Sequence, residues 1–539
     1  MTAAVVLLLL SLAGLVLFFY ILRRRRWAKN IDGPRSKSLI LGNLLDLIAP
    51  ITGRDWQIDA ANRYGGVVKI KGLFNRPSLL VSDPMALHHI LVKEPTIFEE
   101  WPAFTTTNSL LFGDGLVATI GEQHRKQRKM LNPVFSWKYL RGMSPTFFTI
   151  GKELEQFLHL KVAGGPQEIE MTACVTQTAL EFIGQNGFGH SFGSFSGSKN
   201  PKHAFAEAVK ELAATVSVMV PAAPFLPLVV RLASPRLRRR FVEIMPFALI
   251  QKLRYIVDIM AGHMEQIFLE KKQSLSQGGH GQAQQHDIMT VLLKANQDSS
   301  ACDRLTDEEL LGQMATLVFT ATDTTSGAIS RLLHLLAQHP EVQNKLVEEI
   351  TAHDEEPDYD TLASLPYMDA VIRETLRVFP PIPMVFRQTT QDASIPLLHP
   401  IQGADGSPLS SVHVPKGTDI FIGILGANHH RATWGEDASE WKPERWLSPL
   451  PESVTANRSI SGVYSHMMTF LAGTRACIGF SFSQMEMKVV LFCLLRSLQF
   501  SLPTDKEIGW NMGLLMTPVL RGNPESIHSH MPLQVRKRE

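Results

Sequence analysis

The chain contains little cysteine for its length of 539 residues. Its four cysteines, Cys174, Cys302, Cys477 and Cys493, are widely separated in the sequence. Small disulfide-stapled folds use many cysteines close together, so this pattern argues against a disulfide framework and suits a reducing compartment.

A bias toward charge of one sign is also absent. The formal net charge is +2, from 53 basic and 51 acidic residues, and no basic stripe alternates with aromatic residues. Neither feature indicates a nucleic-acid partner. The glycine-rich run at residues 187–193 is one residue off the dinucleotide fingerprint and follows no strand, so it predicts a loop.

No Pro- or Ser-rich linker divides the chain. The one low-complexity stretch, residues 277–286, is polar and indicates a solvated surface loop. Because 45% of the residues are hydrophobic, the chain can bury a large core. We therefore predict one large domain, residues 27–539, behind a short N-terminal segment, residues 1–26.

The N-terminal segment resembles a membrane anchor. Residues 2–22 carry no charge, which meets the roughly 20 residues needed to cross a bilayer, and four arginines follow at 23–26. A cleaved signal peptide has its basic residues before the apolar run, so the order here favours an anchor. By the positive-inside rule, residues 27–539 would face the cytosol. A buried core helix is the alternative.

Helical patterns dominate the rest, and a mainly α fold with small β-sheets is predicted. Short β-rich runs at residues 67–70 and 78–81 predict a hairpin, and runs at 395–398 and 412–414 predict a second pair of strands. The clearest helix runs from Thr306 to about Gln338, because Thr306 and Glu309 fit a capping box and Pro340 follows. Its apolar content on nearly every face indicates a helix that crosses the centre of the protein.

The most specific pattern lies at residues 470–479, FLAGTRACIG, where Cys477 stands in a glycine-flanked loop before a helical run. A helix N-terminus stabilises a thiolate through its dipole and free amides. Gly473 and Gly479 lack the Cβ that would keep a flat ligand away from the backbone. The pattern indicates a cysteine that ligates a metal carried in a planar macrocycle. A buried structural thiol is the alternative for an isolated cysteine.

These ten residues match, position for position, the haem-binding signature of the cytochrome P450 family, Phe-x-x-Gly-x-Arg-x-Cys-x-Gly. The chain resembles that family from about Pro34 to about Leu520. The resemblance implies the P450 fold, haem b as cofactor and Cys477 as the ligand of its iron. It also implies that four neighbours shape the haem-binding loop: Phe470, Gly473, Arg475 and Gly479.

Within the long predicted helix, residues 320–325 (TATDTT) place an acid beside hydroxyl groups in apolar surroundings. In one interpretation the threonines bond back to carbonyls one turn earlier and kink the helix. The resemblance implies that the kink opens a groove for dioxygen, where Thr324 donates a hydrogen bond to the oxygen at the haem and Asp323 relays protons. The match is partial, because the family has glycine where this chain has Ala321.

Glu374 and Arg377 stand at i and i+3, where a helix allows an ion pair. This spacing alone is a weak signal, but it resembles the family's Glu-x-x-Arg, whose third partner would be Arg445. The resemblance implies a structural triad and no catalytic role.

Two haem propionates need cationic or hydrogen-bonding partners, because an unpaired buried carboxylate is costly. The resemblance supplies four candidates: His124, Arg128, Arg387 and Arg475. Three more cations lie on the predicted helix that carries His124 and Arg128: Arg125, Lys126 and Lys129. They are candidates for docking an acidic redox partner, and solvated surface charge is the alternative.

Together these motifs predict a haem-thiolate monooxygenase that inserts one oxygen atom from dioxygen into a lipophilic substrate. Apolar segments lie where the family shapes its substrate cavity, at residues 101–116, 216–230, 382–386 and 512–519. The second could also dip into the bilayer. His124 and the TATDTT stretch resemble fungal members that modify terpenoids and other secondary metabolites.

The chain has no flavin or nicotinamide fingerprint, so the resemblance implies electrons from NADPH through a separate cytochrome P450 reductase at the endoplasmic reticulum membrane. Cytochrome b5 is a further candidate donor. Two alternatives stay open. An isomerase-type relative would consume no dioxygen, but such relatives tend to lose the acid and alcohol that Asp323 and Thr324 provide. A non-catalytic haem protein would need neither a large cavity nor a proton relay.

Overall fold

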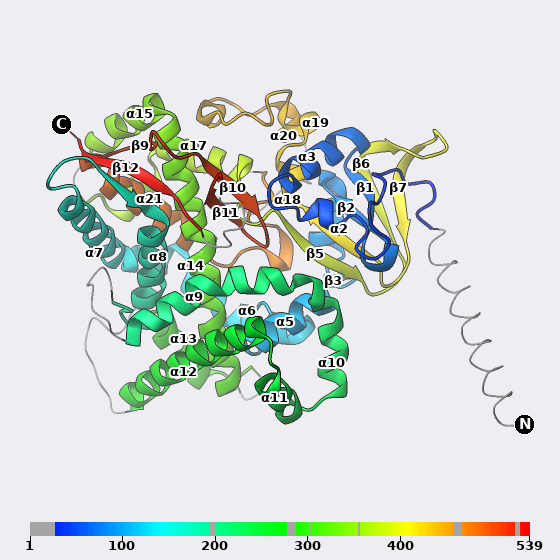
Figure 1. Ribbon diagram of the computed structural model, residues 1–539, viewed down its shortest axis with the longest axis horizontal. Coiled ribbons are helices and arrows are strands. Elements are labelled where there is room, and N and C mark those ends of the chain that lie inside the picture. Colours follow the sequence, from blue (N-terminus) through cyan, green and yellow to red (C-terminus); the bar gives the residue numbers. More distant parts are fainter. Residues whose placement is uncertain are drawn as a thin grey trace, which may run out of the picture. The chain divides into compact units, whose positions relative to one another are not determined.

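The structure, a computed structural model, describes residues 27–193, 201–276, 287–300, 303–353, 356–455, 466–522 and 529–538. The predicted membrane anchor (residues 1–26), the polar loop at 277–286 and Cys302 lie outside these ranges. Helices dominate and small sheets accompany them (Figure 1), which confirms the predicted mainly α fold with small β-sheets.

The predicted domain consists of two compact units. The first contains the described residues up to Trp101, Pro383–Ser439 and the described part of Pro451–Ala476. The second contains Pro102–Ile382, Glu440–Leu450 and Cys477–Glu539, again in their described parts.

A five-stranded sheet in the order β1-β2-β8-β5-β3 organises the first unit. Its strands are β1 (Val67–Lys71), β2 (Pro77–Val81), β3 (Phe98–Glu100), β5 (Met384–Thr389) and β8 (Asp419–Gly423). β1 and β2 pair antiparallel, which confirms the predicted hairpin, and β6 (Ala393–Gln402) pairs with β7 (Pro408–Val414) as predicted. Leu47, Val68, Leu80 and Phe421 pack in the core.

Short helices complete the first unit: α2 (Leu44–Leu47), α3 (Gly53–Tyr64), α4 (Pro84–His88), α18 (Ile424–Asn428), α19 (Arg431–Trp434) and α20 (Glu452–Thr455).

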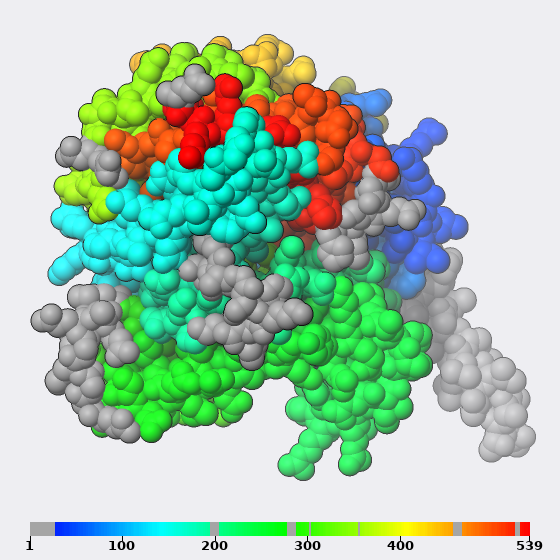
Figure 2. Space-filling model, turned by 60° about the vertical axis from the view of Figure 1, so that its left-hand side comes forward, coloured from blue at the N-terminus to red at the C-terminus, as the bar shows by residue number. Residues whose placement is uncertain are grey.

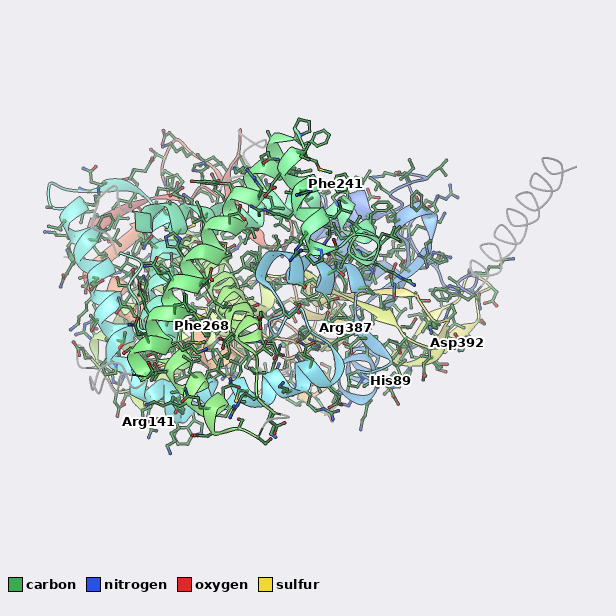
Figure 3. The ribbon with its side chains drawn as sticks, turned by 90° about the horizontal axis from the view of Figure 1, so that it is seen from below. His89, Arg141, Phe241, Phe268, Arg387 and Asp392 are labelled. Carbon is green, nitrogen blue, oxygen red and sulfur yellow. The ribbon has the colours of Figure 1, made fainter. Side chains whose placement is uncertain are left out.

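The second unit is built mainly from helices. They are α5 (Pro102–Phe112), α6 (Gly121–Leu131), α7 (Trp137–Lys161), α8 (Met171–Phe188), α9 (Pro201–Met219), α10 (Leu226–Leu232), α11 (Pro235–Ile244), α12 (Ala248–Ser276), α13 (Ile288–Asp298), α14 (Asp307–Gln338), α15 (Pro340–Thr351), α16 (Tyr359–Ala363), α17 (Pro366–Val378) and α21 (Phe480–Ser497). Helices α9 to α12 gather at one end of this unit, drawn in green (Figure 2). Phe268 of α12 is buried in its core (Figure 3).

Two small sheets belong to the same unit. β12 (Pro532–Lys537) lies between β4 (Gln167–Glu170) and β9 (Leu498–Ser501), and β10 (Ile508–Met512) pairs with β11 (Met516–Leu520).

Helix α14 confirms the long helix predicted from the sequence. Thr306 caps it through the predicted capping box with Glu309, and the helix ends before Pro340. It packs beside α8, and most of its residues are buried. A Cβ on Gly115 would lie 2.4 Å from the carbonyl oxygen of Gly312. The loop after α5 therefore touches α14 at a point where both segments need glycine.

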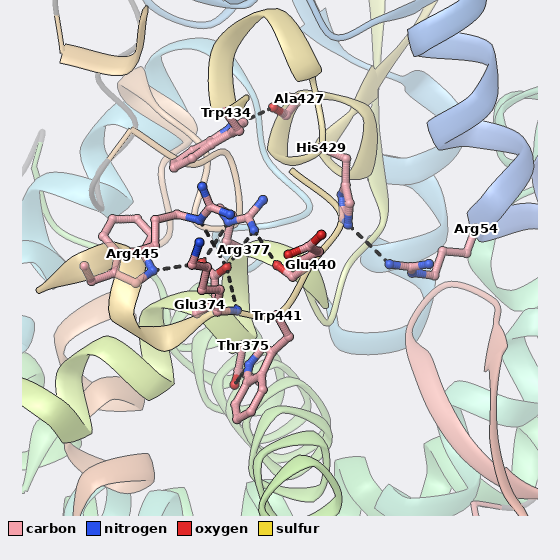
Figure 4. A network of polar contacts seen from close by, with 12 residues as sticks. Arg54, Glu374, Thr375, Arg377, Ala427, His429, Trp434, Glu440, Trp441 and Arg445 are labelled. Carbon is pink, nitrogen blue, oxygen red and sulfur yellow. Dashed lines mark hydrogen bonds and ion pairs between the residues drawn. The ribbon is translucent and has the colours of Figure 1, made fainter. Parts of the chain in front are cut away.

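One buried carboxylate joins α17 to the segment at residues 440–446 (Figure 4). Glu374 and Arg377 are fully buried, and Arg377 Nη2 and Nε lie 2.7 and 2.9 Å from the two Glu374 oxygens. Arg445 Nε, Trp446 Nε1 and the backbone N–H of Lys442 donate to the same carboxylate at 3.2, 2.9 and 3.1 Å. The structure thus brings Glu374, Arg377 and Arg445 together.

We predict that Glu374→Ala lowers the free energy of unfolding by about 3–5 kcal/mol, because it leaves the buried Arg377 and Arg445 guanidiniums without their carboxylate. Asp360→Ala is the control, since it removes a bidentate partner of Arg141 from a pair whose side chains are 50% and 62% exposed. That change should cost about 1 kcal/mol or less. Denaturant titration measures both, and equal costs would contradict the prediction.

Candidate functional site

Cys477 differs from the other described cysteines in its accessibility. It lies three residues before Phe480, the first residue of α21, and its side chain is exposed, whereas Cys174 and Cys493 are buried. An exposed sulfur at this position can reach a ligand, which a buried structural thiol cannot do.

Protein groups act on the Cys477 thiol in opposite directions. Burial among surrounding atoms raises its pKa, while a hydrogen bond from the Gly479 backbone N–H and the Arg128 cation lower it, and the net direction is upward. Cys477 thus lies among dense surroundings but keeps an exposed side, and a ligand needs only that side to reach the sulfur. The sequence argument identified the stabilising amide but not the larger effect of burial.

The two glycines of the loop have different reasons to be glycine. Gly473 has φ of 69°, and a Cβ there would lie 2.0 Å from the Leu91 carbonyl oxygen, so the protein's own backbone excludes a side chain. A Cβ on Gly479 would meet no atom within 4 Å. Open space beside the cysteine is therefore found at Gly479.

The segment before the cysteine is fastened by Asn428 of α18. The Met468 N–H donates to Asn428 Oδ1 at 2.8 Å, and Asn428 Nδ2 donates to the Thr469 hydroxyl at 2.9 Å. Phe470 follows and is half-buried, and Leu471 adopts φ of 56°. The sequence pattern gave no indication of Asn428.

Arg387 and Arg475 each contact glutamates of β3. Arg387 Nη1 lies 2.8 Å from Glu100 Oε2, and Arg475 Nη2 lies 3.2 Å from Glu99 Oε1. Arg387 is only 2% exposed (Figure 3), and its Nη2 is buried without a partner. Sequence reasoning missed both glutamates, because their partners are hundreds of residues away.

His124 and Arg128 lie on α6, with His124 buried and Arg128 half-buried. The other cations of this helix have acidic neighbours. The pairs are Arg125 with Glu122 at 3.1 Å, Lys126 with Glu309 at 3.9 Å and Lys129 with Asp303 at 3.1 Å. Their charges are thus partly balanced on this surface.

Thr324 bonds back along its own helix, since its hydroxyl donates to the Thr320 carbonyl at 2.7 Å. Thr320 does the same to the Thr316 carbonyl at 2.8 Å. Asp323 has one fully buried carboxyl oxygen, Oδ2, without a partner, and burial raises its pKa to about 8. Part of Asp323 is exposed to solvent, but the burial of its carboxyl group disfavours the charged form. The acid is therefore mostly protonated at neutral pH.

Glu486 of α21 is a second buried acid, and the sequence analysis did not identify it. It is 0% exposed, and neither carboxyl oxygen has a hydrogen-bond partner within accepted geometry. Burial raises its pKa well above the usual range, and the nearby Thr325 hydroxyl opposes this shift without forming an aligned hydrogen bond. A lone acid in a long apolar run, MEMKVVLFCLL, was the only available signal.

The side chains at Cys477 suit a metal ion whose other ligands come from a bound cofactor and not from the protein. Within the described ranges, no three His, Cys, Asp or Glu side chains gather closely enough to hold a metal ion. A metal at Cys477 must therefore carry other ligands, as iron does in a porphyrin. In the second unit, the open space at Gly479 suits such a flat group. In the first unit, the unpartnered Arg387 Nη2 is a donor for a carboxylate.

Comparisons with known proteins identify the family. The family model for cytochrome P450 matches residues 33–521. Cytochrome P450 monooxygenases 91 and 81 of Postia placenta are 44% and 45% identical to the chain, over 94% and 98% of it and 93% and 97% of their own lengths. Ganoderic acid synthetase of Ganoderma lucidum is 38% identical over 98% of both chains. The chain therefore belongs to the cytochrome P450 family and is a monooxygenase, an oxidoreductase, of that family.

Proposed function

We propose that this monooxygenase inserts one atom of dioxygen into a lipophilic small molecule, a terpenoid or another secondary metabolite. The second oxygen atom leaves as water, and the reaction consumes two protons and two electrons, which come from NADPH through a separate reductase. The exposed Cys477 before α21 carries the proposal. The relative named ganoderic acid synthetase supports the substrate class.

Haem b would be held through the Cys477 thiolate. Its propionates would be bound by Arg387 and Arg475, with His124 and Arg128 as further partners. Bound haem supplies the one-electron and dioxygen chemistry that amino-acid side chains lack. The chain itself would contribute ligation, orientation and protons.

Asp323 and Thr324 would deliver those protons. Because the pKa of Asp323 is raised to about 8, its carboxyl group holds a proton at neutral pH and can donate it. The only hydrogen of the Thr324 hydroxyl is committed to the Thr320 carbonyl. Thr324 can therefore donate elsewhere only after this bond is released, which makes the back-bonded and the donating interpretations distinguishable by experiment.

Apolar contacts support a lipophilic substrate. In the second unit, Phe112 of α5 stacks on Phe319 of α14 with ring centres 4.9 Å apart. In the first unit, Trp101 and Phe386 lie 5.5 Å apart. Both pairs fall in or beside the segments that the sequence analysis assigned to the cavity.

We also propose that the protein resides at the endoplasmic reticulum membrane, anchored by residues 1–26 with its catalytic part in the cytosol. Among the described residues, one helical stretch is long and apolar enough to cross a membrane, Ala204–Leu232, and its most apolar part is mostly unburied. Prolines at 221, 224 and 227 interrupt it. An exposed, interrupted apolar stretch suits the membrane surface better than a span.

Helix α11 extends this surface and turns its polar side toward α12. Arg239 pairs with Asp258 of α12 at 2.7 Å and with Glu243 at 2.7 Å, which fixes one side of the helix. Leu237, Phe241 and Ile244 share the opposite side and are 47%, 57% and 79% exposed. An outward apolar face with neighbouring arginines, Arg236 and Arg240, complements an anionic bilayer.

Cys477→Ala should abolish the red-shifted Soret band of the reduced carbon monoxide complex, because that band requires a thiolate on the iron. The control, Cys174→Ala, replaces a buried thiol and should keep the band. Difference spectra of both variants test the assignment. A variant that kept the band without Cys477 would exclude this ligand.

Thr324→Ala should divert electrons to hydrogen peroxide and lower product formation on the order of 10²-fold, the lower end for a positioned proton donor. Thr320→Ala is the matched control, because Thr320 makes the same bond to a carbonyl one turn earlier. Product and peroxide per NADPH are measured with a substrate identified by metabolite profiling. Equal effects of the two changes would favour the helix-kink interpretation.

A protein lacking residues 1–26 should still bind vesicles of phosphatidylcholine that contain phosphatidylserine, through the surface around α11. Changing both Leu237 and Phe241 to Gln should weaken binding by about tenfold or more, because each loses apolar burial in the bilayer. Leu160→Gln, at a 77% exposed leucine of α7, should not. Co-sedimentation measures binding, and unchanged binding of the double variant would refute the surface.

A further inference from the structure

Four charged side chains of the first unit form a closed cluster. Antiparallel pairing of β3 with β5 sets Glu100 opposite Arg387, and their side chains meet at 2.8 Å. Arg475 reaches both acids, at 3.2 Å from Glu99 and 3.8 Å from Glu100. The cluster therefore contains two positive and two negative groups.

The cluster is shielded from water. The side chains of Arg387 and Glu100 are 2% and 9% exposed, and those of Arg475 and Glu99 are 12% and 18% exposed. Charges in such surroundings are weakly screened by salt and act on their neighbours over longer distances than surface charges do. Within the cluster, the two positive and the two negative charges cancel.

Haem would disturb this balance. If Arg387 and Arg475 bind the propionates with His124 and Arg128 as further partners, as the proposed function has it, three guanidiniums and an imidazole must serve four carboxylates. Arg387 still has a free donor in Nη2, so the geometry allows a further carboxylate without displacing Glu100. The result is an excess of negative charge beside the haem edge, and an added electron meets more repulsion there.

We propose that Glu99 and Glu100 act through Arg387 and Arg475 as charge-setting residues that keep the reduction potential of the bound haem low. Motif matching does not reveal them, because neither glutamate belongs to the haem-binding signature. Arg387 and Arg475 would then pair with the propionates and with these acids at the same time. The acids would offset part of the positive charge that the arginines present to the haem.

The test is a spectroelectrochemical titration of the full-length haem protein. Glu100→Gln keeps the size of the side chain and an oxygen for Arg387 but removes one charge, so the potential should shift to more positive values. Glu99→Gln, at the more exposed acid, should shift it in the same direction by less. Asp392→Asn changes an exposed acid of the same unit and should leave it unchanged.

Potentials of both glutamine variants equal to that of Asp392→Asn, or shifted to more negative values, would overturn the proposal. Loss of haem from both folded variants would overturn it as well, because removal of a competing carboxylate should favour propionate binding. Failure of the proposed function looks different: the unmodified protein itself would then lack the haem Soret band.

Discussion

The buried carboxylate of Glu374 is the interaction on which much of the second unit depends. A fully buried charge is tolerated only when donors surround it, and five donors from α17 and residues 442–446 do so. Because guanidinium and carboxylate groups meet in defined geometries, the interaction admits one placement of residues 442–446 against α17. The interaction therefore serves mainly to fix how residues 442–446 lie against α17, and less to raise the free energy of unfolding.

Helix α14 shows how a polar function is fitted into an apolar core. Its capping box anchors the N-terminus, and its glycine contact at Gly312 brings the loop after α5 against it. Further along the helix, Asp323 keeps an unpartnered carboxyl oxygen while Thr324 is satisfied within the helix. The acid is thus the group that is ready to interact, and the alcohol is the group that must first be released.

Local signals in the sequence were sufficient for several elements. The capping box and Pro340 set the ends of α14, and short β-rich runs predicted the β1–β2 and β6–β7 pairs. The cysteine loop was recognisable because its pattern is contiguous. Glu99, Glu100 and Asn428 escaped prediction for the opposite reason, since each acts on a partner that only the folded chain brings near. For Gly473, the sequence suggested room for a ligand, whereas the Leu91 backbone imposes the glycine.

The buried acid Glu486 has a thermodynamic consequence. An unfolded glutamate loses its proton near pH 4, whereas burial makes the folded protein retain it to much higher pH. Unfolding at a pH between the unfolded and the folded pKa therefore releases a proton, and this residue's contribution to stability declines as pH rises through that interval. Asp258, whose pKa the hydrogen-bonded Arg239 guanidinium lowers, favours the fold on the alkaline side of that pKa. Glu486 acts in the opposite sense, so α21 gains stability from acidity where most ion pairs lose it.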